Sequence, residues 1–467
     1  MEKKRFNVVV IGAGPGGYVA AIKAAQNGRS VALIEKEYLG GTCLNVGCIP
    51  TKTLLANAQI MHKIKMAGEY GIFTGPVSFD YSKMKQRKDH VIEKIRKSLG
   101  GLLNANKIQI FSGKAEFLSP TEIKVVGNDN CMLEAENVII ATGSEPLDIP
   151  AFPCDHKKIL NSTSILELTE VPKSLAVIGG GYIGCEFASL FAELGVKVTI
   201  LEALPSILSL QGKAVGDALL ASFKKQNVDV KTGVFVEKIE PLDNGGVKIF
   251  IKGSDPVEMD LALVAVGRKI NSSKLGLEKA GVKVGEKGEV IVNEKMETNV
   301  PGIYAIGDVT GRFLLAHVAS HQGIVAASNI LEHEMKMNYN AVPAVIFTLP
   351  EIATVGMTLE QAKEAGYAAE IGKFPFAALG KSIASIDTEG FAEVVIDKRT
   401  GQILGAQVVG HEASTLIAEI TLAINNELTA ECVADTIHAH PTVAEAWMEG
   451  ALIALNSPIH MPPKKKA

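Results

Sequence analysis

The chain contains two stretches in which apolar, glycine-rich and alanine-rich segments follow one another in the same order. In the first, an apolar run at residues 8–11 enters a glycine-rich turn at 12–17, an alanine-rich segment follows, and a second apolar run ends in Glu35. A short apolar run bounded by glycines is typical of a buried strand, and the segment after the turn has the length of a helix. The pattern therefore predicts a strand, a turn, a helix and a strand.

The same order recurs when residues 7–36 are laid over residues 174–203. Each copy has a GxGxxG turn and an acid at the end of its second strand, and the matched positions are Gly12, Gly14, Gly17, Gly28, Val31 and Glu35 with Gly179, Gly181, Gly184, Gly195, Val198 and Glu202. Such glycines let backbone N–H groups approach a pyrophosphate at a helix N-terminus, and the acid accepts from ribose hydroxyls. One GxGxxG is weak evidence, but two in this context predict two dinucleotide-binding folds.

The remaining patterns complete these two folds and then change character. Strands that end in glycine are expected at 138–143 and 263–267, the second fold begins near Val171, and further elements of the first are expected at 302–306 and 316–331. From about residue 341 the chain has no nucleotide fingerprint, and its patterns predict strands at 391–396 and 403–409 and helices at 414–425 and 443–455. We therefore expect a C-terminal α+β domain.

Composition narrows the class of protein. The 467 residues carry a formal charge of −4, so a polyanionic partner such as nucleic acid is not expected. No apolar run is long enough to span a membrane, and the first strand begins too near Met1 to leave room for a targeting peptide, so we expect a cytoplasmic protein. The six cysteines are too few for a disulfide scaffold, and most should be reduced and buried.

Two of the cysteines stand apart in the segment GGTCLNVGCIPTK, which places Cys43 and Cys48 five residues apart. In a regular helix their Cα atoms would be about 9 Å apart, beyond the roughly 7 Å limit for a disulfide. A bridge therefore needs a break in the helix, which Gly47 and Pro50 can provide. Two unrelated core cysteines are the alternative, but a redox pair beside a dinucleotide fold explains the segment better.

A second chemical motif lies near the end of the chain, where IHAHPTVAEAW brings together His438, His440 and Glu445 around Pro441. The two histidines could form a metal pair, but no further ligands at suitable spacing are evident. His440, with a carboxylate at the start of the next helix, has the features of an oriented general base.

These motifs together resemble the FAD-dependent pyridine nucleotide disulfide oxidoreductases, over essentially the whole chain. The segments that carry the resemblance are IGAGPGGYVAAI, GGTCLNVGCIPTK, VIIATGS, VIGGGYIGCEFA, LVAVGR, IYAIGDV, LAH and HAHPTVAE. The resemblance implies an α/β fold with two Rossmann-like domains and a C-terminal α+β dimerisation domain. It divides the chain into an FAD-binding domain at 1–148 and 271–340, an NAD-binding domain at 149–270 and a dimerisation domain at 341–467.

The resemblance also implies an activity and its partners. The expected enzyme oxidises protein-bound dihydrolipoamide to lipoamide and reduces NAD to NADH through a Cys43–Cys48 disulfide and FAD. It would be a homodimer serving 2-oxo acid dehydrogenase complexes or the glycine cleavage system, with lipoyl domains and an acyltransferase core as partners and no nucleic acid, membrane or metal. An apolar channel leading to Cys43 should provide specificity.

Cofactor residues follow by position. For FAD the resemblance points to Gly12, Gly14, Gly17, Glu35, Lys52, Gly113, Ala115, Ala141, Thr142, Gly143, Asp308, Leu315, Ala316 and His317. For NAD it points to Gly179, Gly181, Gly184, Glu186, Glu202 and Gly267. Independently of the family, Glu202 favours NAD over NADP because a carboxylate would repel a 2′-phosphate.

The resemblance assigns the catalytic roles as well. Cys43 would be the interchange thiol, Cys48 the thiol beside the flavin, and Lys52 would form an ion pair with Glu186 near the flavin ring. His440, oriented by Glu445, would act as the base and would come from the neighbouring subunit. Glu186 as a merely solvated helix residue is the alternative for that position.

Related activities on the same fold are the alternatives to this one. Glutathione, trypanothione and mercuric reductases share the cysteine motif but usually run from NADPH, which Glu202 disfavours. NADH peroxidases and oxidases use one cysteine, so the Cys43–Cys48 pair disfavours them. A redox-inert flavoprotein is disfavoured because Cys43, Cys48, Lys52, His440 and Glu445 are all present. The basic run at 83–97 predicts an exposed amphipathic helix with a solvated face, and the tail PPKKKA adds further basic residues.

Overall fold

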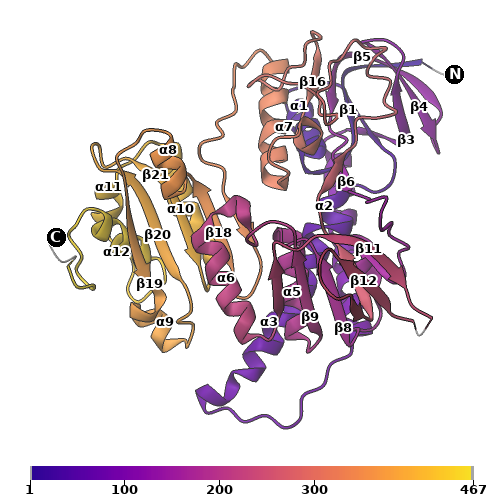
Figure 1. The fold of residues 1–467 in the computed structure, drawn as a ribbon. Helices are drawn as coiled ribbons and strands as arrows, with labels where there is room; N and C mark the ends of the chain where they lie inside the picture. Colours follow the sequence, from indigo (N-terminus) through magenta and orange to yellow (C-terminus); the bar gives the residue numbers. More distant parts are fainter. Residues whose placement is uncertain (1–2, 244, 464–467) are drawn as a thin grey trace.

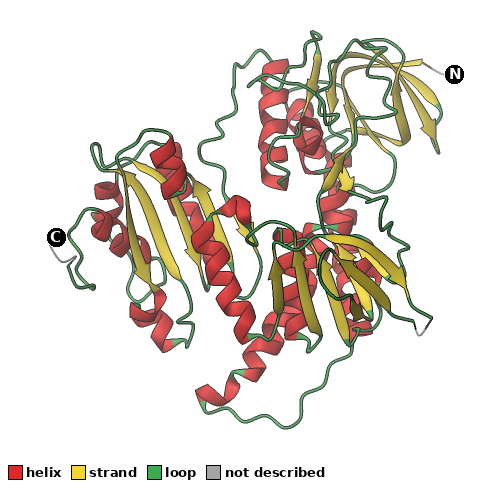
Figure 2. Ribbon diagram, viewed as in Figure 1, coloured by secondary structure: helices red, strands yellow, loops and turns green. Residues whose placement is uncertain are grey.

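Three large sheets, of six, five and five strands, organise the part of the chain that the structure describes (Figures 1 and 2). The structure is a computed structural model that describes residues 3–243 and 245–463, so the lysines of the basic tail lie outside the described residues. Each sheet is covered by helices and has its own hydrophobic core. The three expected kinds of domain are therefore present.

The first sheet is formed by residues from both ends of the expected FAD-binding region. Its strands are β1 (Lys3–Ile11), β2 (Val31–Glu35), β3 (Gln109–Phe117), β4 (Glu122–Gly127), β5 (Cys131–Ile140) and β16 (Ile303–Ala305). β1 pairs in parallel with β2 and β5, and β16 pairs in parallel with β5, whereas β4 is antiparallel to its neighbours. The distant β16 therefore completes a parallel sheet that the first half of the chain begins.

Helices α1 (Pro15–Gln26) and α7 (Ala316–Ile330) pack against each other at this sheet. Glycines make the close approach possible: a Cβ on Gly16 would lie 2.8 Å from the carbonyl oxygen of Ala319, and a Cβ on Gly323 would lie 2.5 Å from that of Gly16. Real side-chain carbons do not come this close to backbone oxygens, so larger residues would push the two helices apart.

The second sheet is entirely parallel, in the order β10-β9-β8-β14-β7. Its strands are β7 (Ile159–Asn161), β8 (Ser174–Ile178), β9 (Lys197–Glu202), β10 (Asp229–Thr232) and β14 (Leu261–Val264), with helices α5 (Tyr182–Glu193) and α6 (Lys213–Lys225). A separate antiparallel sheet joins β11 (Val236–Pro241), β12 (Val247–Ile251) and β13 (Val257–Met259).

The chain passes between the first two sheets through two short strands that pair with each other. These are β6 (Ser144–Pro146) and β15 (Arg268–Ile270), which run antiparallel. They lie within a few residues of the boundaries expected at 148 and 271, so the outgoing and returning segments form one double connection.

The third sheet is antiparallel and lies in the region where the sequence patterns predicted an α+β domain. It contains β17 (Ala344–Ile346), β18 (Ile352–Gly356), β19 (Ala369–Pro375), β20 (Phe391–Asp397) and β21 (Ile403–Val409), covered by α8 (Leu359–Glu364), α9 (Gly380–Ala384), α10 (Ala413–Asn425), α11 (Ala430–Ala434) and α12 (Glu445–Ala454). Trp447 is fully buried here, and its indole N–H donates to the carbonyl of Leu416. Burying this polar group costs little because it has a partner.

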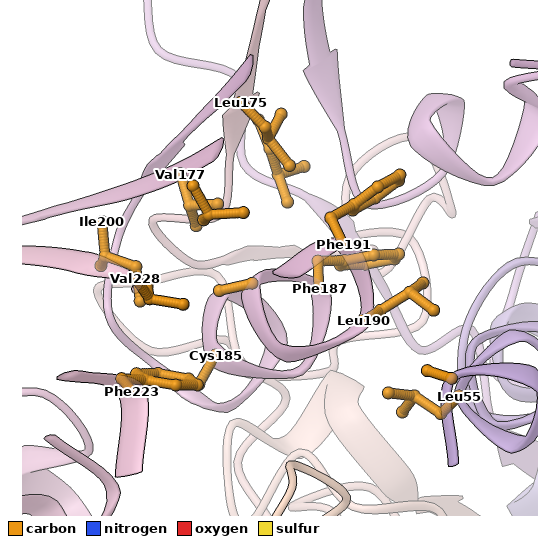
Figure 3. Close-up of a cluster of buried hydrophobic side chains, with 14 of the residues drawn as sticks. Leu55, Leu175, Val177, Cys185, Phe187, Leu190, Phe191, Ile200, Phe223 and Val228 are labelled. Atoms are coloured by element: carbon orange, nitrogen blue, oxygen red, sulfur yellow. The ribbon is translucent and has the colours of Figure 1, made fainter. Parts of the chain in front are cut away.

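Three helices inserted after β2 connect the first sheet to the second. They are α2 (Gly41–Val46), α3 (Cys48–Lys65) and α4 (Tyr81–Ala105). Figure 3 shows that Leu55 of α3 lies in the same apolar cluster as Leu190 and Phe191 of α5. This shared core holds the two dinucleotide folds together.

The expectation of a simple solvated face on α4 was only partly right. Lys88 is 1% exposed, and its ammonium group contacts Asp89 at 2.8 Å, Glu167 at 3.1 Å and the carbonyl of Leu166 at 3.0 Å. Glu167 belongs to the 3₁₀ helix η2 (Ser164–Glu167) of the second fold. A buried lysine requires such partners because an unpaired buried charge is very costly.

The expectation for the remaining cysteines was also partly right. Cys131 and Cys185 are buried, Cys154 is partly buried, and Cys432 is exposed. Within 3–243 and 245–463, no helix is both long and apolar enough to cross a membrane.

Candidate active site

The two GxGxxG turns have nearly the same backbone geometry. Gly12 and Gly179 have φ angles of +103° and +105°, in the region that favours glycine. A Cβ on Gly17 would lie 1.8 Å from the carbonyl oxygen of Gly12, and one on Gly184 would lie 2.0 Å from that of Gly179. Only glycine fits at these positions, so both turns keep the close strand-to-helix packing that a dinucleotide fold needs.

The N-termini of the two helices are open to an anion. Gly14 and Gly181 are the N-caps of α1 and α5, and neither cap has a side chain that accepts from the helix N–H groups. No atom lies within 4 Å of where a Cβ on either glycine would be. The unsatisfied N–H groups and the helix dipole therefore suit a pyrophosphate at both sites.

The acid at the end of each second strand is held against its turn. Glu35 accepts from the N–H of Ala13 at 2.8 Å. Glu202 accepts from Gly180 at 2.5 Å and, with its other oxygen, from Leu204 at 2.6 Å. Backbone hydrogen bonds thus orient both carboxylates beside the turns, where the ribose of a bound dinucleotide would lie.

The other expected FAD residues lie around the carboxyl ends of the first sheet. Ala141, Thr142 and Gly143 directly follow β5, and the register of β2 with β3 ends at Glu35 and Ser112, so β3 extends beyond its neighbour at Gly113 and Ala115.

Asp308 lies in the 3₁₀ helix η4 (Gly307–Thr310), and its carboxylate accepts from the hydroxyl of Ser144 at 2.5 Å. Leu315 is the N-cap of α7, and Ala316 and His317 begin that helix. The imidazole of His317 lies 2.8 Å from the carbonyl oxygen of Pro343.

Gly267, expected near NAD, has a φ of +139°. An open helix terminus, a glycine turn and a ring of strand ends together fit FAD in the first fold and NAD in the second.

The cysteine segment shows the helix break that its spacing requires. Cys43 lies in α2, Cys48 begins α3, and Gly47 between the helices has φ −144° and ψ −109°. The break lets the two thiols come into hydrogen-bonding contact. A continuous helix would have kept them on different faces.

The environment makes Cys48 the more acidic thiol of the pair. Its hydrogen bond with Cys43 and the positive charge of Lys52 lower the pKa of Cys48 to about 7, although burial opposes this shift. The same hydrogen bond and burial raise the pKa of Cys43 above its usual range. In the dithiol form, the negative charge therefore resides on Cys48 near neutral pH.

Lys52 and Glu186 form an ion pair between the first two folds. The lysine Nζ lies 2.7 Å and 2.8 Å from the two carboxylate oxygens, and Glu186 is buried, so it is not a solvated helix residue. The carboxylate also accepts at 3.0 Å from the N–H of Phe347, which follows β17. All three domains therefore meet at Glu186.

An apolar cavity of about 340 Å³ opens beside Cys43. Its wall is drawn from α1, the cysteine segment and α4, and consists of Pro15, Tyr18, Gly40, Cys43, Leu44, Ile49, Ile95, Ser98, Leu99 and Leu102. The sequence did not single out the α4 residues of this wall. Their helical spacing of three and four was the available signal, but it is also the spacing of ordinary core positions.

His440 and Glu445 form the expected pair, with the imidazole Nδ1 2.8 Å from a carboxylate oxygen. The other carboxylate oxygen accepts from the N–H of Thr442 at 2.9 Å, which fixes the glutamate. His438 instead contacts Glu419 at 2.8 Å, so the two histidines have different partners. In the part of the chain that is described, no three metal-binding side chains converge on a site.

The His440 imidazole is 77% exposed. It precedes α12, which Figure 1 shows near one edge of the molecule, with the strands of the third sheet between it and α2. Within one chain, therefore, the structure does not bring His440 and Cys43 together.

Comparison with known proteins decides the family. The model of the pyridine nucleotide-disulphide oxidoreductases matches residues 6–323, and the model of their dimerisation domain matches residues 342–451. The chain belongs to the pyridine nucleotide-disulphide oxidoreductases. Membership confirms the expected fold class, with FAD and NAD as cofactors, and the dimerisation domain supports a homodimer.

Individual relatives extend this comparison over the whole chain. A dihydrolipoyl dehydrogenase from Chlamydia pneumoniae is 50% identical over 462 residues, 99% of each chain, and one from Geobacillus stearothermophilus is 44% identical over 456 residues, 97% of each. Among solved structures, LpdA from Mycobacterium tuberculosis matches with a TM-score of 0.90 and 28% identity, covering 96% of this chain and 99% of its own. The HOCl-induced flavoprotein disulfide reductase RclA from Escherichia coli matches with a TM-score of 0.87, 30% identity and the same coverage.

Proposed function

We propose that this chain is an NAD-dependent dihydrolipoyl dehydrogenase. The observation that carries the proposal is a pair of thiols, Cys43 and Cys48, of which Cys43 lines an apolar cavity and Cys48 has its thiolate favoured by Lys52. A dithiol on a long hydrocarbon arm is a substrate that such a cavity would accept. The relatives with this activity match nearly the whole chain.

The catalytic cycle begins at the oxidised Cys43–Cys48 pair. A substrate thiolate attacks the sulfur of Cys43, the Cys43–Cys48 bond breaks, and Cys48 leaves as a thiolate. The second substrate thiol loses its proton to His440 and attacks the substrate sulfur of the mixed disulfide. Lipoamide leaves, the proton on His440 returns to Cys43, and both electrons remain on the two cysteines.

The low pKa of Cys48 assists the first step because a stable thiolate is a good leaving group. Glu445 holds the imidazole of His440 in one orientation. The residues of the first fold would hold FAD and those of the second fold NAD, and bound FAD would supply the hydride chemistry by which the two thiols are reoxidised with NAD as the electron acceptor. Glu202 selects NAD because its carboxylate would repel a 2′-phosphate.

The base must come from a second subunit. In one chain the strands of the third sheet lie between α12, which follows His440, and α2, which contains Cys43 (Figure 1). The dimerisation domain supports a partner that can bring its own His440 to Cys43. The active site is then shared between two chains. We further propose that the substrate arm is carried on lipoyl domains of 2-oxo acid dehydrogenase complexes or of the glycine cleavage system, whose acyltransferase core would be a partner.

The test is NADH formation from dihydrolipoamide by the purified holoenzyme, with NADP in place of NAD as the comparison. We expect turnover with NAD, little with NADP, and loss of turnover in Cys48→Ser and His440→Ala variants that still bind FAD. Mixing the two inactive variants provides a test of the shared site, because a heterodimer can contain one complete site. A yellow protein that ignores dihydrolipoamide but oxidises NADPH with another disulfide would contradict the proposal.

A further inference from the structure

We propose that the exposed basic side of α4 docks an acidic surface of the protein domain that carries the dithiol arm. This inference rests on the proposed function, because it assumes a substrate attached to a protein. The basic stripe is defined here as Lys83, Arg87, Lys94 and Lys97, all of them exposed.

The first observation is that α4 lines the same cavity as Cys43. The helix contributes Ile95, Ser98, Leu99 and Leu102 to the wall. Leu99 is buried, whereas Ile95 and Leu102 are 39% and 49% exposed, so these two mark the outer part of the wall. An arm attached to a protein enters from this side, and the carrier domain must then lie against the surface next to Ile95 and Leu102.

The second observation is that the basic stripe borders this opening. At 3.6 residues per turn, Arg87, Lys94 and Ser98 lie along one line of the helix, and Ile95 and Leu102 lie on its flank. Lys83 and Lys97 lie on the other flank of the same line. The positive charges therefore begin beside the entrance, at Lys94, and continue away from it around the helix to Lys97.

The third observation concerns which charges are already neutralised. α4 contains seven Lys and Arg residues and two Asp and Glu residues. Lys85 and Lys88 turn inward and pair with Asp89 and Glu167. Among the described residues no carboxylate lies within ion-pair distance of Lys83, Lys94 or Lys97, and Arg87 donates to the carbonyl of Thr53.

These observations specify the chemistry of the partner. A chain with a net charge of −4 presents a local row of unpaired cations at the entrance of its substrate cavity. Such a row attracts a domain with acidic residues around the attachment point of its arm, and it speeds encounter more than it tightens binding. A small free substrate carries no such acidic surface and should not sense the stripe.

The experiment compares two substrates on a Lys94→Glu/Lys97→Glu variant of the holoenzyme. One is free dihydrolipoamide, and the other is a purified, reduced lipoyl domain of net negative charge. At low ionic strength we expect kcat/KM for the lipoyl domain to fall about tenfold or more, and the difference to shrink as salt screens the charges. The value for free dihydrolipoamide should stay unchanged.

A matched control is a Lys224→Glu/Lys363→Glu variant, which makes the same charge change at exposed lysines of α6 and α8. It should lower kcat/KM for the lipoyl domain much less. Flavin content and gel filtration report whether each variant is folded and dimeric.

Three results would overturn the proposal: unchanged kinetics with the lipoyl domain, an equal loss with both substrates, or an equal loss in the control variant. If the stripe variant becomes monomeric, the stripe belongs to the subunit interface, and the proposal is likewise wrong. Failure of the wild-type enzyme to oxidise free dihydrolipoamide would refute the proposed function itself, which separates the two ideas.

Discussion

The two dinucleotide folds of this protein share one backbone plan but differ in what surrounds it. Their glycine turns and helix N-termini correspond closely, and α1 and α5 are both twelve residues long. After its second strand, however, the first fold continues into the cysteine helices, whereas the second continues toward α6. The same unit therefore serves two cofactors because different segments follow it.

The helices α1 and α5 also differ in how they meet their neighbours. α1 approaches α7 through glycine and alanine, with almost no polar contact. α5 carries Glu186, Ser189 and Glu193 at spacings of three and four, which places them on one face. This face makes polar contacts with the other two domains.

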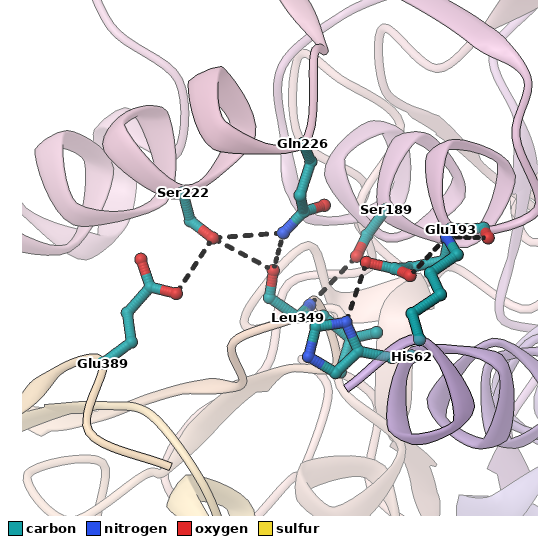
Figure 4. Close-up of polar contacts among 8 residues, drawn as sticks. His62, Ser189, Glu193, Ser222, Gln226, Leu349 and Glu389 are labelled. Atoms are coloured by element: carbon teal, nitrogen blue, oxygen red, sulfur yellow. Dashed lines mark hydrogen bonds and ion pairs between the residues drawn. The ribbon is translucent and has the colours of Figure 1, made fainter. Parts of the chain in front are cut away.

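Figure 4 shows these contacts around the loop that contains Leu349. The hydroxyl of Ser189 accepts from the N–H of Leu349 at 2.9 Å, and Gln226, which directly follows α6, donates to the Leu349 carbonyl at 2.6 Å. Glu193 contacts the imidazole of His62 on α3 at 3.1 Å. Helix α1 of the first fold therefore packs on α7 through close contact of small residues, whereas α5 of the second fold is joined to the other domains by specific hydrogen bonds and ion pairs.

The largest effect should come from the glycine that closes each turn. Gly17→Ala and Gly184→Ala would each place a carbon about 2 Å from a backbone oxygen, which the turn cannot absorb. We expect Gly17→Ala to lose FAD, and Gly184→Ala to keep FAD but lose NAD reduction. Flavin absorbance per chain and NADH formation measure the two results.

Gly68→Ala is the control for this pair, because no atom lies within 4 Å of its added carbon. Equal flavin content in the Gly17 and Gly184 variants would contradict the assignment of one cofactor to each fold.

The next largest effect should come from replacing Lys52, the residue of α3 that forms an ion pair with Glu186 of α5. Its charge helps lower the pKa of Cys48 to about 7, so the thiolate is present above about pH 7 and is lost below it. Lys52→Met should move that transition to higher pH, and a rise of one unit lowers the thiolate fraction at pH 7 from about one half to about one tenth. The pH dependence of alkylation of the reduced enzyme measures the shift.

Lys63→Met is the matched variant, since Lys63 lies on the same helix but is exposed. An alkylation profile that is identical in the Lys52 variant and the wild type would show that Lys52 does not control Cys48.

A smaller effect on cofactor binding is expected from replacing Glu35 or Glu202, the two carboxylates expected to accept from the ribose hydroxyls of the cofactors. Glu202→Gln weakens a charged hydrogen-bond acceptor, a change of about 1.5–3 kcal/mol, so KM for NAD should rise about tenfold or more while flavin content stays constant. Glu35→Gln should have the opposite pattern, with weaker FAD retention and an unchanged KM for NAD. Steady-state kinetics and flavin release measure the pair, and a rise in KM for NAD in both variants would contradict the separation.

The smallest effect should be structural. Ser189→Ala leaves the N–H of Leu349 without its acceptor, which costs about 1–3 kcal/mol of stability when the group is buried. Denaturant unfolding measures this loss. Ser320→Ala on α7 is the control, because that hydroxyl only donates to Ala316 within its own helix and should matter by a few tenths of a kcal/mol, about the size of an ordinary surface change. Equal destabilisation by both variants would show that the polar anchoring of α5 has no special role.

Much of the fold was predictable because its signals are local. The tight turn between a strand and a helix can be formed only with glycine at fixed positions. The GxGxxG motif with its acid occurs twice, so both turns could be predicted from the sequence. The break at Gly47 was predictable for the same reason, since two thiols five residues apart cannot meet across a regular helix. The pair of His440 and Glu445 is likewise close in sequence.

Features that depend on distant partners were not predictable in this way. The sequence pattern placed Lys88 in a solvated row of cations, but the side chain is buried and forms ion pairs with Glu167 and Asp89. The sequence left Glu186 open as a surface residue, whereas the structure buries it in contact with Lys52 and the N–H of Phe347. The cavity wall from α4 had the spacing of an ordinary core.

The sequence by itself therefore determined the two dinucleotide turns, the redox pair and the oriented histidine, because each depends on backbone conformation or on residues within a few positions. Only the tertiary structure decided which charges are buried, where the cavity opens and which polar groups join the domains. Burial and charge pairing depend on what lies opposite a side chain in space, and residues far apart in the chain provide that environment.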